Sequence, residues 1–217
     1  MKFDFAIVIQ FMPEILAGFL QTLLLCFAGC LIGIPIAVLL CLGRLDDGPY
    51  SRLCNLITDT FRSMPEMIIL FWVYYCVPLI FDLRLSPVGA GLIGLTCYAA
   101  SNLSEIFRSG IRAVPKGQVE AAFTLGLPER DIWLKVVVPQ ALRAMTGPFV
   151  TFGTSLLKVS GLLSSIGVAE MTYRATVISG QNYKYLELFT AVGAMYFIVI
   201  FPLSMLAQRF ELKSSKW

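Results

Sequence analysis

Residues 15–42 read ILAGFLQTLLLCFAGCLIGIPIAVLLCL, and no charged residue lies between Glu14 and Arg44. A helix that crosses a bilayer needs about 20 mainly apolar residues, so this stretch predicts a membrane span. The whole chain has the same character, because its 217 residues are 57% hydrophobic and only 14% charged, with a mean hydropathy of +0.77. A soluble domain would be about 25% charged. We therefore expect an integral membrane protein.

Four further apolar stretches predict spans at about 55–80, 87–106, 142–166 and 187–207. Together with residues 15–42 they make about five transmembrane helices, which form a single membrane domain over residues 1–217. The expected fold class is therefore an all-α integral membrane protein.

Basic residues in the loops predict how these helices are oriented. With the N-terminus outside, four basic residues lie in outer segments, and eleven lie in inner ones: Arg44, Arg52, Arg108, Arg112, Lys116, Arg130, Lys135, Arg143, Arg209, Lys213 and Lys216. Cytoplasmic loops carry the excess of Lys and Arg. We expect the N-terminus outside and the C-terminus inside.

Several classes of function do not fit this composition. The formal net charge is only +3 and the basic residues form no dense stripe, so we expect no nucleic-acid partner. The chain has no histidine, the commonest metal ligand, and we expect no metal and no cofactor. It also lacks the Gly-x4-Gly-Lys-Ser/Thr phosphate loop, which indicates that it has no ATP site of its own.

The long inner loop, about 107–141, has an ordered pattern. Residues 114–140 read VPKGQVEAAFTLGLPERDIWLKVVVPQ. Pro115 suits the first turn of a helix and Gly126 the left-handed residue that ends it. Between them Val119, Ala122 and Phe123 are spaced to share one apolar face. A second short helix is expected after Pro128. Such an amphipathic loop predicts a docking surface for a partner.

The same residues resemble the signature of ABC importer permeases, in which Glu-Ala-Ala is followed by Gly and by an aliphatic-x-aliphatic-Pro group. Here Glu120-Ala121-Ala122, Gly126 and Val136-x-Val138-Pro139 have that spacing. Other stretches are similar to the polar amino-acid branch of these permeases, which includes histidine, glutamine, arginine and opine permeases: Phe61–Pro65, Glu105–Ile111, Pro115–Gln118, Leu156–Lys158 and Ile166–Glu170.

The resemblance implies one half of a type I importer in a bacterial cytoplasmic (inner) membrane. Two permease subunits, identical or sister chains, would form a path that opens alternately to each side. A cytoplasmic ABC ATPase dimer would bind below, and an extracytoplasmic solute-binding protein would bring the solute above, meeting the outer loop 167–186. The family's ATPase-coupling helix would correspond here to Gln118, Glu120, Ala121, Ala122 and Gly126, with Pro139 following.

Charged and polar residues inside the predicted spans are candidates for the substrate path, because charges at membrane depth are costly. They are Glu66, Asn102, Glu105 and Lys158. Asp59, Arg62 and Glu66 are also spaced to share one helical face, on which the two acids can bracket Arg62. Glu105 has a second interpretation, as an interfacial partner of Arg108 or Arg112.

The chain departs from the branch at Lys158-Val159-Ser160-Gly161, where Lys-Asp-Thr-Ser is usual. One hypothesis is therefore that a sister permease carries most of the substrate contacts. Three further interpretations stay open. One is a permease for another small solute, such as an opine, methionine or a compatible solute. The others are an integral membrane enzyme and an assembly protein.

Overall fold

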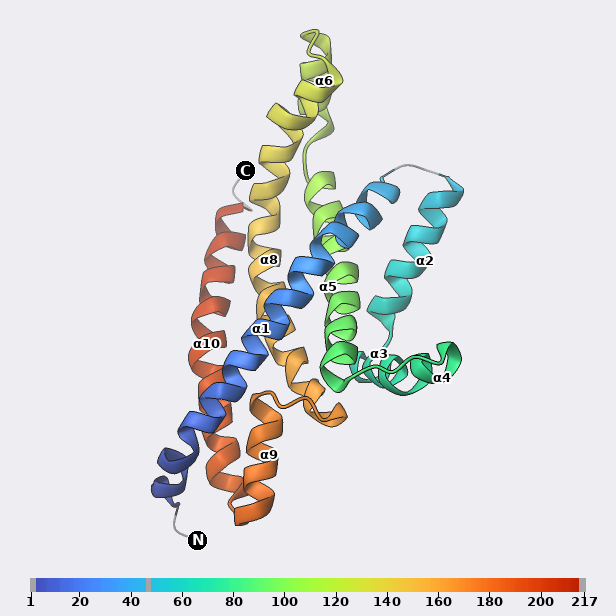
Figure 1. The fold of residues 1–217 in the computed structure, drawn as a ribbon. Coiled ribbons are helices and arrows are strands. Elements are labelled where there is room, and N and C mark those ends of the chain that lie inside the picture. Colours follow the sequence, from blue (N-terminus) through green and yellow to red (C-terminus); the bar gives the residue numbers. More distant parts are fainter. Residues whose placement is uncertain (1–2, 46–47, 215–217) are drawn as a thin grey trace.

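The computed structural model describes residues 3–45 and 48–214, and these residues form helices joined by short connections (Figure 1). In chain order the helices are α1 (Phe5–Gly43), α2 (Pro49–Ser63), α3 (Glu66–Phe71), η1 (Trp72–Cys76), α4 (Val77–Phe81), α5 (Pro87–Arg112), α6 (Lys116–Thr124), α7 (Glu129–Asp131), η2 (Ile132–Val137), α8 (Val138–Ser160), η3 (Gly161–Ile166), α9 (Met171–Asn182) and α10 (Tyr185–Ser214). No strand occurs in the described residues, and the all-α expectation is confirmed.

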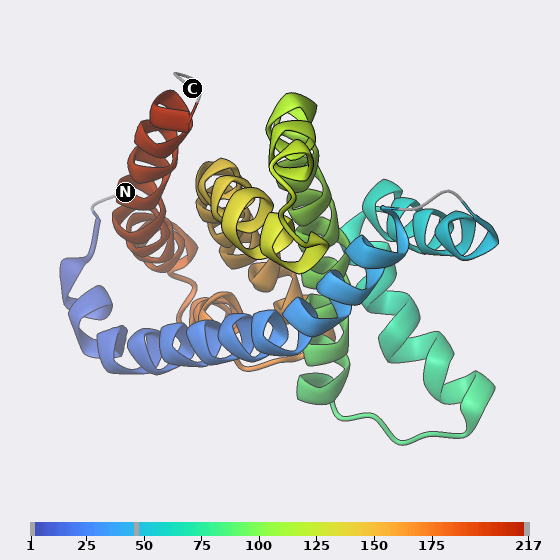
Figure 2. The same cartoon turned by 90° about the horizontal axis from the view of Figure 1, so that it is seen from above.

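The helix α5 lies in the middle of the bundle, with α1, α2, α3 and α8 packed around it (Figures 1 and 2). The helices α2 and α10 lie on opposite flanks. The main core combines apolar side chains of α1, α5 and α8, among them Leu25, Leu103 and Leu156. A second core joins α1, α9 and α10 around Ile15, Met171 and Leu188.

Two glycines allow α1 and α5 to cross closely. A Cβ added at Gly29 would lie 2.9 Å from Leu95 Cβ, and one at Gly33 would lie 2.8 Å from Ala99 Cβ. These distances are shorter than any carbon–carbon contact allows, so only glycine fits at these two points of α1. The Gly29-x-x-x-Gly33 spacing is thus a packing feature.

The second predicted span, residues 55–80, is not one continuous helix. The helix α2 ends at Ser63, and the pair Pro49–Ser63 and Glu66–Phe81 is bent by 105°. Pro65 stands at the break with ψ of 132°, because a proline cannot continue the hydrogen-bonding pattern of the preceding helix. Asp59 and Arg62 therefore lie on α2, whereas Glu66 begins α3. The prediction of one face shared by all three residues is wrong.

Within residues 3–45 and 48–214, three helical segments are long and apolar enough to cross a membrane: Phe5–Gly43, Glu129–Ile166 and Tyr185–Phe210. The bent pair makes a fourth if it is counted as one span. The predicted third span lies in α5, which has 26 residues but carries buried polar side chains such as Thr96, Ser101 and Ser104. Its neighbours are protein, so α5 has less need of an apolar surface than the outer helices.

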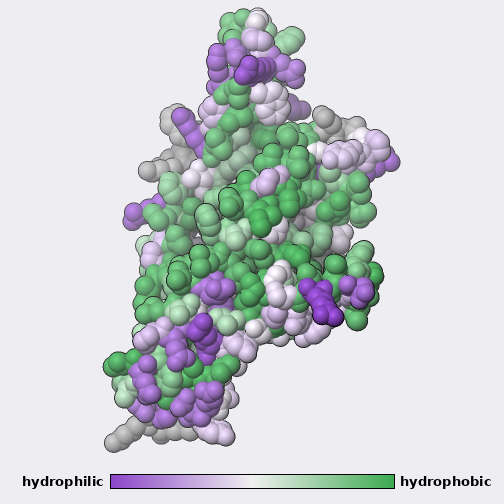
Figure 3. Space-filling view, viewed as in Figure 1, coloured by the Kyte–Doolittle hydropathy of each residue, from purple (hydrophilic) through white to green (hydrophobic). Residues whose placement is uncertain are grey.

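The surface agrees with a membrane protein. Figure 3 shows apolar surface across the middle of the molecule and hydrophilic surface at its two ends, near α6 and near α9. The start of α1 and the last turns of α10 lie toward opposite ends (Figure 1), as the predicted orientation requires.

Candidate functional site

The helix α6 stands at one tip of the molecule, beyond the ends of α1 and α10 (Figure 1). Pro115 caps its N-terminus with an extended backbone, and Gly126 follows its end with a left-handed φ of 77°. A glycine adopts this conformation without strain, so the predicted role of Gly126 as the terminating residue is confirmed. The chain then returns through α7 and η2 into α8 without a gap, so the second short helix expected after Pro128 is the beginning of a longer one.

The predicted coupling residues are brought together on this projection. Gln118, Glu120, Ala121 and Gly126 are exposed, whereas Ala122 is buried against the returning helix. Pro139 lies exposed at the start of α8, and its neighbour Gln140 donates a hydrogen bond from Nε2 to Oε1 of Gln118 at 3.4 Å. The small side chain of Ala122 thus faces inward, and its polar neighbours face solvent.

The apolar face of α6 differs from the prediction at one residue. Ala122 and Val119 pack against the core formed by α5, η2 and α8, but Phe123 is 76% exposed. Leu125 is 81% exposed. Large apolar side chains this exposed, at the tip of an otherwise hydrophilic projection, are typical of a surface that a partner covers.

A groove of about 860 Å³ runs between α6 and the returning helix. Apolar side chains from both walls line it, and charged ones stand at its rim: Ile111, Val114, Val119, Phe123, Ile132, Trp133 and Val137, with Lys116, Glu120 and Glu129. The tip therefore offers both an exposed apolar ridge and a shallow groove.

A group of charged residues lies where the end of α1 meets α2 and α5. We call this the Glu105 cluster; its members are Arg44, Asp59, Arg62, Glu105 and Arg108. Glu105 Oε2 lies 2.8 Å from a guanidinium nitrogen of Arg44, 3.4 Å from one of Arg62 and 3.9 Å from one of Arg108. Arg44 also lies 3.7 Å from Asp59 Oδ1. Glu105 Oε2 on α5 thus contacts arginines from the end of α1, from α2 and from α5 itself.

Glu105 was expected either to line the path or to pair with Arg108 or Arg112, and the pair with Arg108 is present. It pairs with Arg108 as well as with Arg44 and Arg62. It also lines a hollow of about 340 Å³ together with Asn102, one turn away on the same helix. The other polar residues of that lining are Arg62, Tyr98, Ser109, Thr151 and Ser155.

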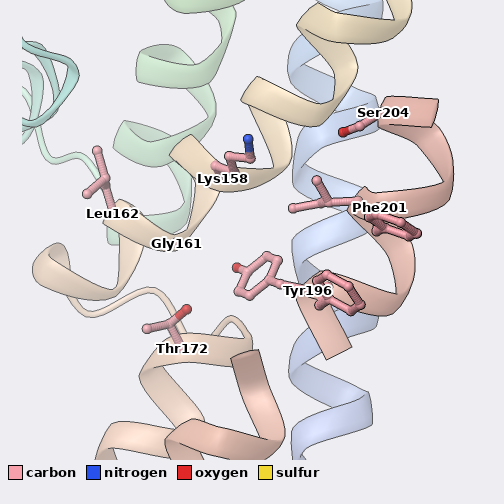
Figure 4. A pocket seen from close by; sticks show the side chains of 9 residues that line it. Lys158, Gly161, Leu162, Thr172, Tyr196, Phe201 and Ser204 are labelled. Carbon is pink, nitrogen blue, oxygen red and sulfur yellow. The ribbon is translucent and has the colours of Figure 1, made fainter. Parts of the chain in front are cut away.

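The other two candidates for the substrate path lie elsewhere. Glu66 is exposed at the start of α3, beside a small space that it shares with Tyr98 and Val159. Lys158 lines a separate pocket of about 520 Å³ between α8 and α10 (Figure 4). Tyr98 borders both the space beside Glu66 and the hollow at Glu105, so these two are neighbours.

The pocket at Lys158 is mainly apolar. In Figure 4 Tyr196 turns its hydroxyl toward Gly161 and Thr172, and Ser204 lies further along α10. A Cβ added at Gly161 would lie 3.4 Å from Tyr196 Oη, which has no hydrogen-bond partner among the described residues.

Two of the buried charged residues, Arg44 and Glu170, make several hydrogen bonds and were not identified as site residues from the sequence. Arg44, 3% exposed, was counted only as a loop charge, yet it donates hydrogen bonds to Asn55, Ser104 and Glu105. Glu170, fully buried, caps α9 by accepting from the backbone N–H groups of Thr172 and Tyr173. Both stand at the ends of helices, where the sequence pattern does not tell which way a side chain turns.

The comparisons with known proteins agree with this geometry. Residues 29–216 match the family described as "Binding-protein-dependent transport system inner membrane component". The chain is 33% identical over 202 residues to the "Probable glutamine ABC transporter permease protein" of Bacillus subtilis (strain 168), covering 91% of this chain and 92% of that protein. It is 29% identical over 214 residues to the arginine transport system permease protein of the same organism, covering 98% of each.

Solved structures extend the likeness to the fold. The crystal structure of an amino acid ABC transporter with histidines contains a chain with a TM-score of 0.89 and 28% identity, covering 98% of this chain and 100% of that one. An inward-facing structure of a methionine ABC transporter has a TM-score of 0.70 at 22% identity, covering 96% of each chain, and shows the shared fold alone. Since the family model covers most of the sequence and these structures share its fold, the chain belongs to the family of binding-protein-dependent transport system inner membrane components.

Proposed function

We propose that this chain is the permease subunit of an ATP-driven importer for a polar amino acid. Family membership supports a transport subunit, and the relatives named for glutamine and arginine support the amino-acid class. The chain itself performs no hydrolysis, because a separate ATPase supplies the energy.

The observation that carries this proposal is the geometry of the α6 tip. Phe123 and Leu125 project from it almost fully exposed, and Glu120 and Gln118 flank them with polar groups. An apolar anchor surrounded by polar contacts is how a short helix is held in a partner's groove. We assign this tip to the cytoplasmic ATPase, with Glu120-Ala121-Ala122 as the coupling helix.

The returning helix gives the tip a rigid connection to the membrane part. The segment Glu129–Ile166 continues from the base of α6 into the bundle, and Ala122 packs against it beside Ile132. A displacement of α6 by the ATPase would therefore be carried along α8 to the region of Ser155 and Lys158. Opening of the path alternately to each side would follow from that movement.

The remaining partners complete the assembly. A second permease subunit, the same chain or a sister chain, provides the other half of the path in a bacterial cytoplasmic membrane. An extracytoplasmic solute-binding protein meets the opposite end, at residues 167–186. Asn102 and Glu105 line the path at their shared hollow, with Glu66 and Lys158 in the neighbouring spaces.

The experiment is a comparison of coupling in proteoliposomes that contain the permease, its ATPase and its binding protein. We expect Gly126→Asp and Glu120→Arg to abolish uptake of the amino acid while the ATPase still hydrolyses ATP and the permease still inserts. Arg52→Gln, a change of an exposed charge on α2 away from the tip, is the matched control and keeps normal uptake. Normal coupled uptake in both tip variants would refute the docking role.

A further inference from the structure

The helix α2, on one flank of the bundle (Figure 1), packs on its neighbours α1 and α5 through small and polar side chains. Its buried residues are Ser51, Cys54 and Thr58. Leu56 is 65% exposed on the opposite side of the helix, and Phe61 is only partly buried against the main core. Little apolar area is therefore removed from water or lipid at this contact. We call the contact of the buried α2 face with α1 and α5 the α2 seam.

Charged and polar side chains make the specific contacts across the α2 seam. Arg44, at the end of α1, donates from Nε to Asn55 Oδ1 at 2.8 Å and lies 3.7 Å from Asp59 Oδ1. Arg62 on α2 lies 3.4 Å from Glu105 Oε2 on α5. Arg44 is also bound to α5, since its guanidinium lies 2.8 Å from the same oxygen of Glu105. The Glu105 cluster therefore holds α2 against the ends of α1 and α5.

The other contacts of α5 are apolar and closely interlocked. Toward α1, a Cβ added at Gly33 would lie 2.8 Å from Ala99 Cβ. Toward α8, a Cβ added at Gly110 would overlap Met145 Cγ, and the core at this point also includes Ala122 of α6. Protein interiors are close-packed, so helices interlocked in this way transmit a displacement to one another. The helices α1, α5, α6 and α8 therefore form one body, and α2 is attached to it along the α2 seam.

The pairs of the Glu105 cluster can exchange partners. Three guanidinium groups share the two carboxylates of Asp59 and Glu105, so one arginine is always incompletely paired. In this structure it is Arg108, which lies 3.9 Å from Glu105 and has no hydrogen-bond partner for its buried Nε among the described residues. A packed apolar contact must be taken apart before its helices slide, whereas a charged hydrogen bond can pass to a new partner or to water. The α2 seam is therefore the contact of α5 that yields most easily.

We propose that the Glu105 cluster is a latch that holds α2 to the body of α1, α5, α6 and α8, and that it opens when the ATPase displaces the tip. The inference rests on the proposed function, which supplies the displacement. The chain bends by 105° at Pro65, and a proline interrupts helical hydrogen bonding, so α2 can change its angle without carrying α3 with it. Opening uncovers Cys54, which is 3% exposed and lies against the end of α1, where a Cβ added at Gly43 would be 2.6 Å from Cys54 Sγ.

Alkylation of the Cys54 thiol by N-ethylmaleimide reports the α2 seam directly. Fragment mass spectrometry of peptides distinguishes Cys54 from the other native thiols, and Cys26, 6% exposed in the main core, is the internal control. The permease–ATPase complex with its binding protein and an amino acid is compared at rest and after trapping with ATP and vanadate. We expect trapping to raise the alkylation rate of Cys54 about tenfold, the factor for loss of a charge-assisted hydrogen bond, and to leave that of Cys26 unchanged.

Variants of the latch test it in the resting chain. Asn55→Ala combined with Asp59→Asn weakens the hold of Arg44 on α2 and leaves its pair with Glu105 in place. We expect this double variant to alkylate Cys54 about tenfold faster than the wild type.

Arg62→Gln removes the other contact across the α2 seam, at a side chain that is 39% exposed, and gives the same result at Cys54. Arg52→Gln, an exposed charge on the same helix, is the matched control and keeps the wild-type rate.

Three results would overturn the latch. They are an unchanged Cys54 rate in both latch variants, an equal rise at Cys26, and a Cys54 that stays protected in a trapped complex. A chain that recruits no ATPase would instead remove the proposed function, and the variants would still test the latch in the chain alone.

Discussion

Arg44 shows how one residue can connect three helices. It follows the last residue of α1, and its buried guanidinium donates to Asn55 on α2 at 2.8 Å and to Glu105 on α5 at 2.8 Å. A charge at this depth is costly unless it is paired and hydrogen-bonded, and Arg44 satisfies both conditions. It therefore fixes the distance between α2 and α5, on which the position of Arg62 depends.

Removing this charge is expected to weaken the fold. Arg44→Gln leaves Glu105 without its closest cation, and breaking a buried pair costs about 3 kcal/mol. We expect a clearly lower melting temperature of the detergent-solubilised permease. Arg52→Gln, an exposed arginine eight residues further along the chain, is the control and melts like the wild type. Equal melting temperatures for both variants would mean that the Arg44 contacts add nothing to stability.

The buried carboxyl of Glu170 makes the free energy of unfolding depend on pH. Burial raises the pKa of this carboxyl above its usual 4.5, while hydrogen bonds from the N–H groups of Thr172 and Tyr173 partly oppose the shift. A raised pKa means that the folded state holds the proton more tightly than the unfolded state. The free energy of unfolding therefore falls as the pH rises from about 4.5 to the folded pKa, and is level above it.

Glu170→Gln removes this titration. The melting temperature of the variant, measured relative to the wild type, should rise as the pH is increased above about 4.5, because the Glu170 carboxyl of the folded wild type must then lose its proton. Thermal melts of both proteins across this range check the difference directly. A difference that stays constant, or that falls with increasing pH, contradicts the account.

At the scale of elements, the crossing of α1 and α5 depends on close backbone approach. Gly33 lies against Ala99, and any side chain at position 33 must push the helices apart. We expect Gly33→Leu to destabilise the permease by about 3 kcal/mol, at the upper end of the cost of overpacking a core. Gly117→Leu is the control, because a Cβ at Gly117 meets nothing within 4 Å. The yield of folded protein in detergent is the measurement, and a normal yield of Gly33→Leu would contradict the close crossing.

The sequence predicted some elements better than others. The bounds of α6 followed from Pro115 and Gly126, because the backbone preferences of proline and glycine act locally. The orientation of Phe123 could not be predicted in this way, since helical periodicity alone placed it on the same face as Val119 and Ala122. Only the path of the returning helix decides which residues of α6 are covered.

The break after α2 has a similar explanation. A proline interrupts the hydrogen bonding of a helix, and the chain bends at Pro65. The size of the bend, 105°, depends on how α3 packs against α5, and that contact joins distant parts of the sequence. Residues on the two sides of such a break no longer follow one helical period, and Arg62 therefore pairs with Glu105 and not with Glu66.

At the scale of the whole molecule, the long apolar stretches predicted the class of fold. The Glu-Ala-Ala motif predicted the short helix α6 that forms the tip. The count of five spans stays a prediction. Among the described residues, three segments and one bent pair are long and apolar enough to cross a membrane, and α5 is more polar than these. The Glu105 cluster could not be predicted in full. Its members come from α1, α2 and α5, and the sequence contains no sign that Arg44 and Arg62 share one oxygen.

The central claim is that an ATPase binds the tip of α6, and co-purification tests it most directly. The wild-type chain and a Phe123→Asp, Leu125→Asp variant are each extracted from native membranes in mild detergent, and the proteins retained with them are identified by mass spectrometry. We predict that an ABC ATPase and a second permease subunit accompany the wild type, while the variant keeps the permease partner and loses the ATPase. An ATPase retained equally by both chains, or absent from both even after mild cross-linking, would contradict the account.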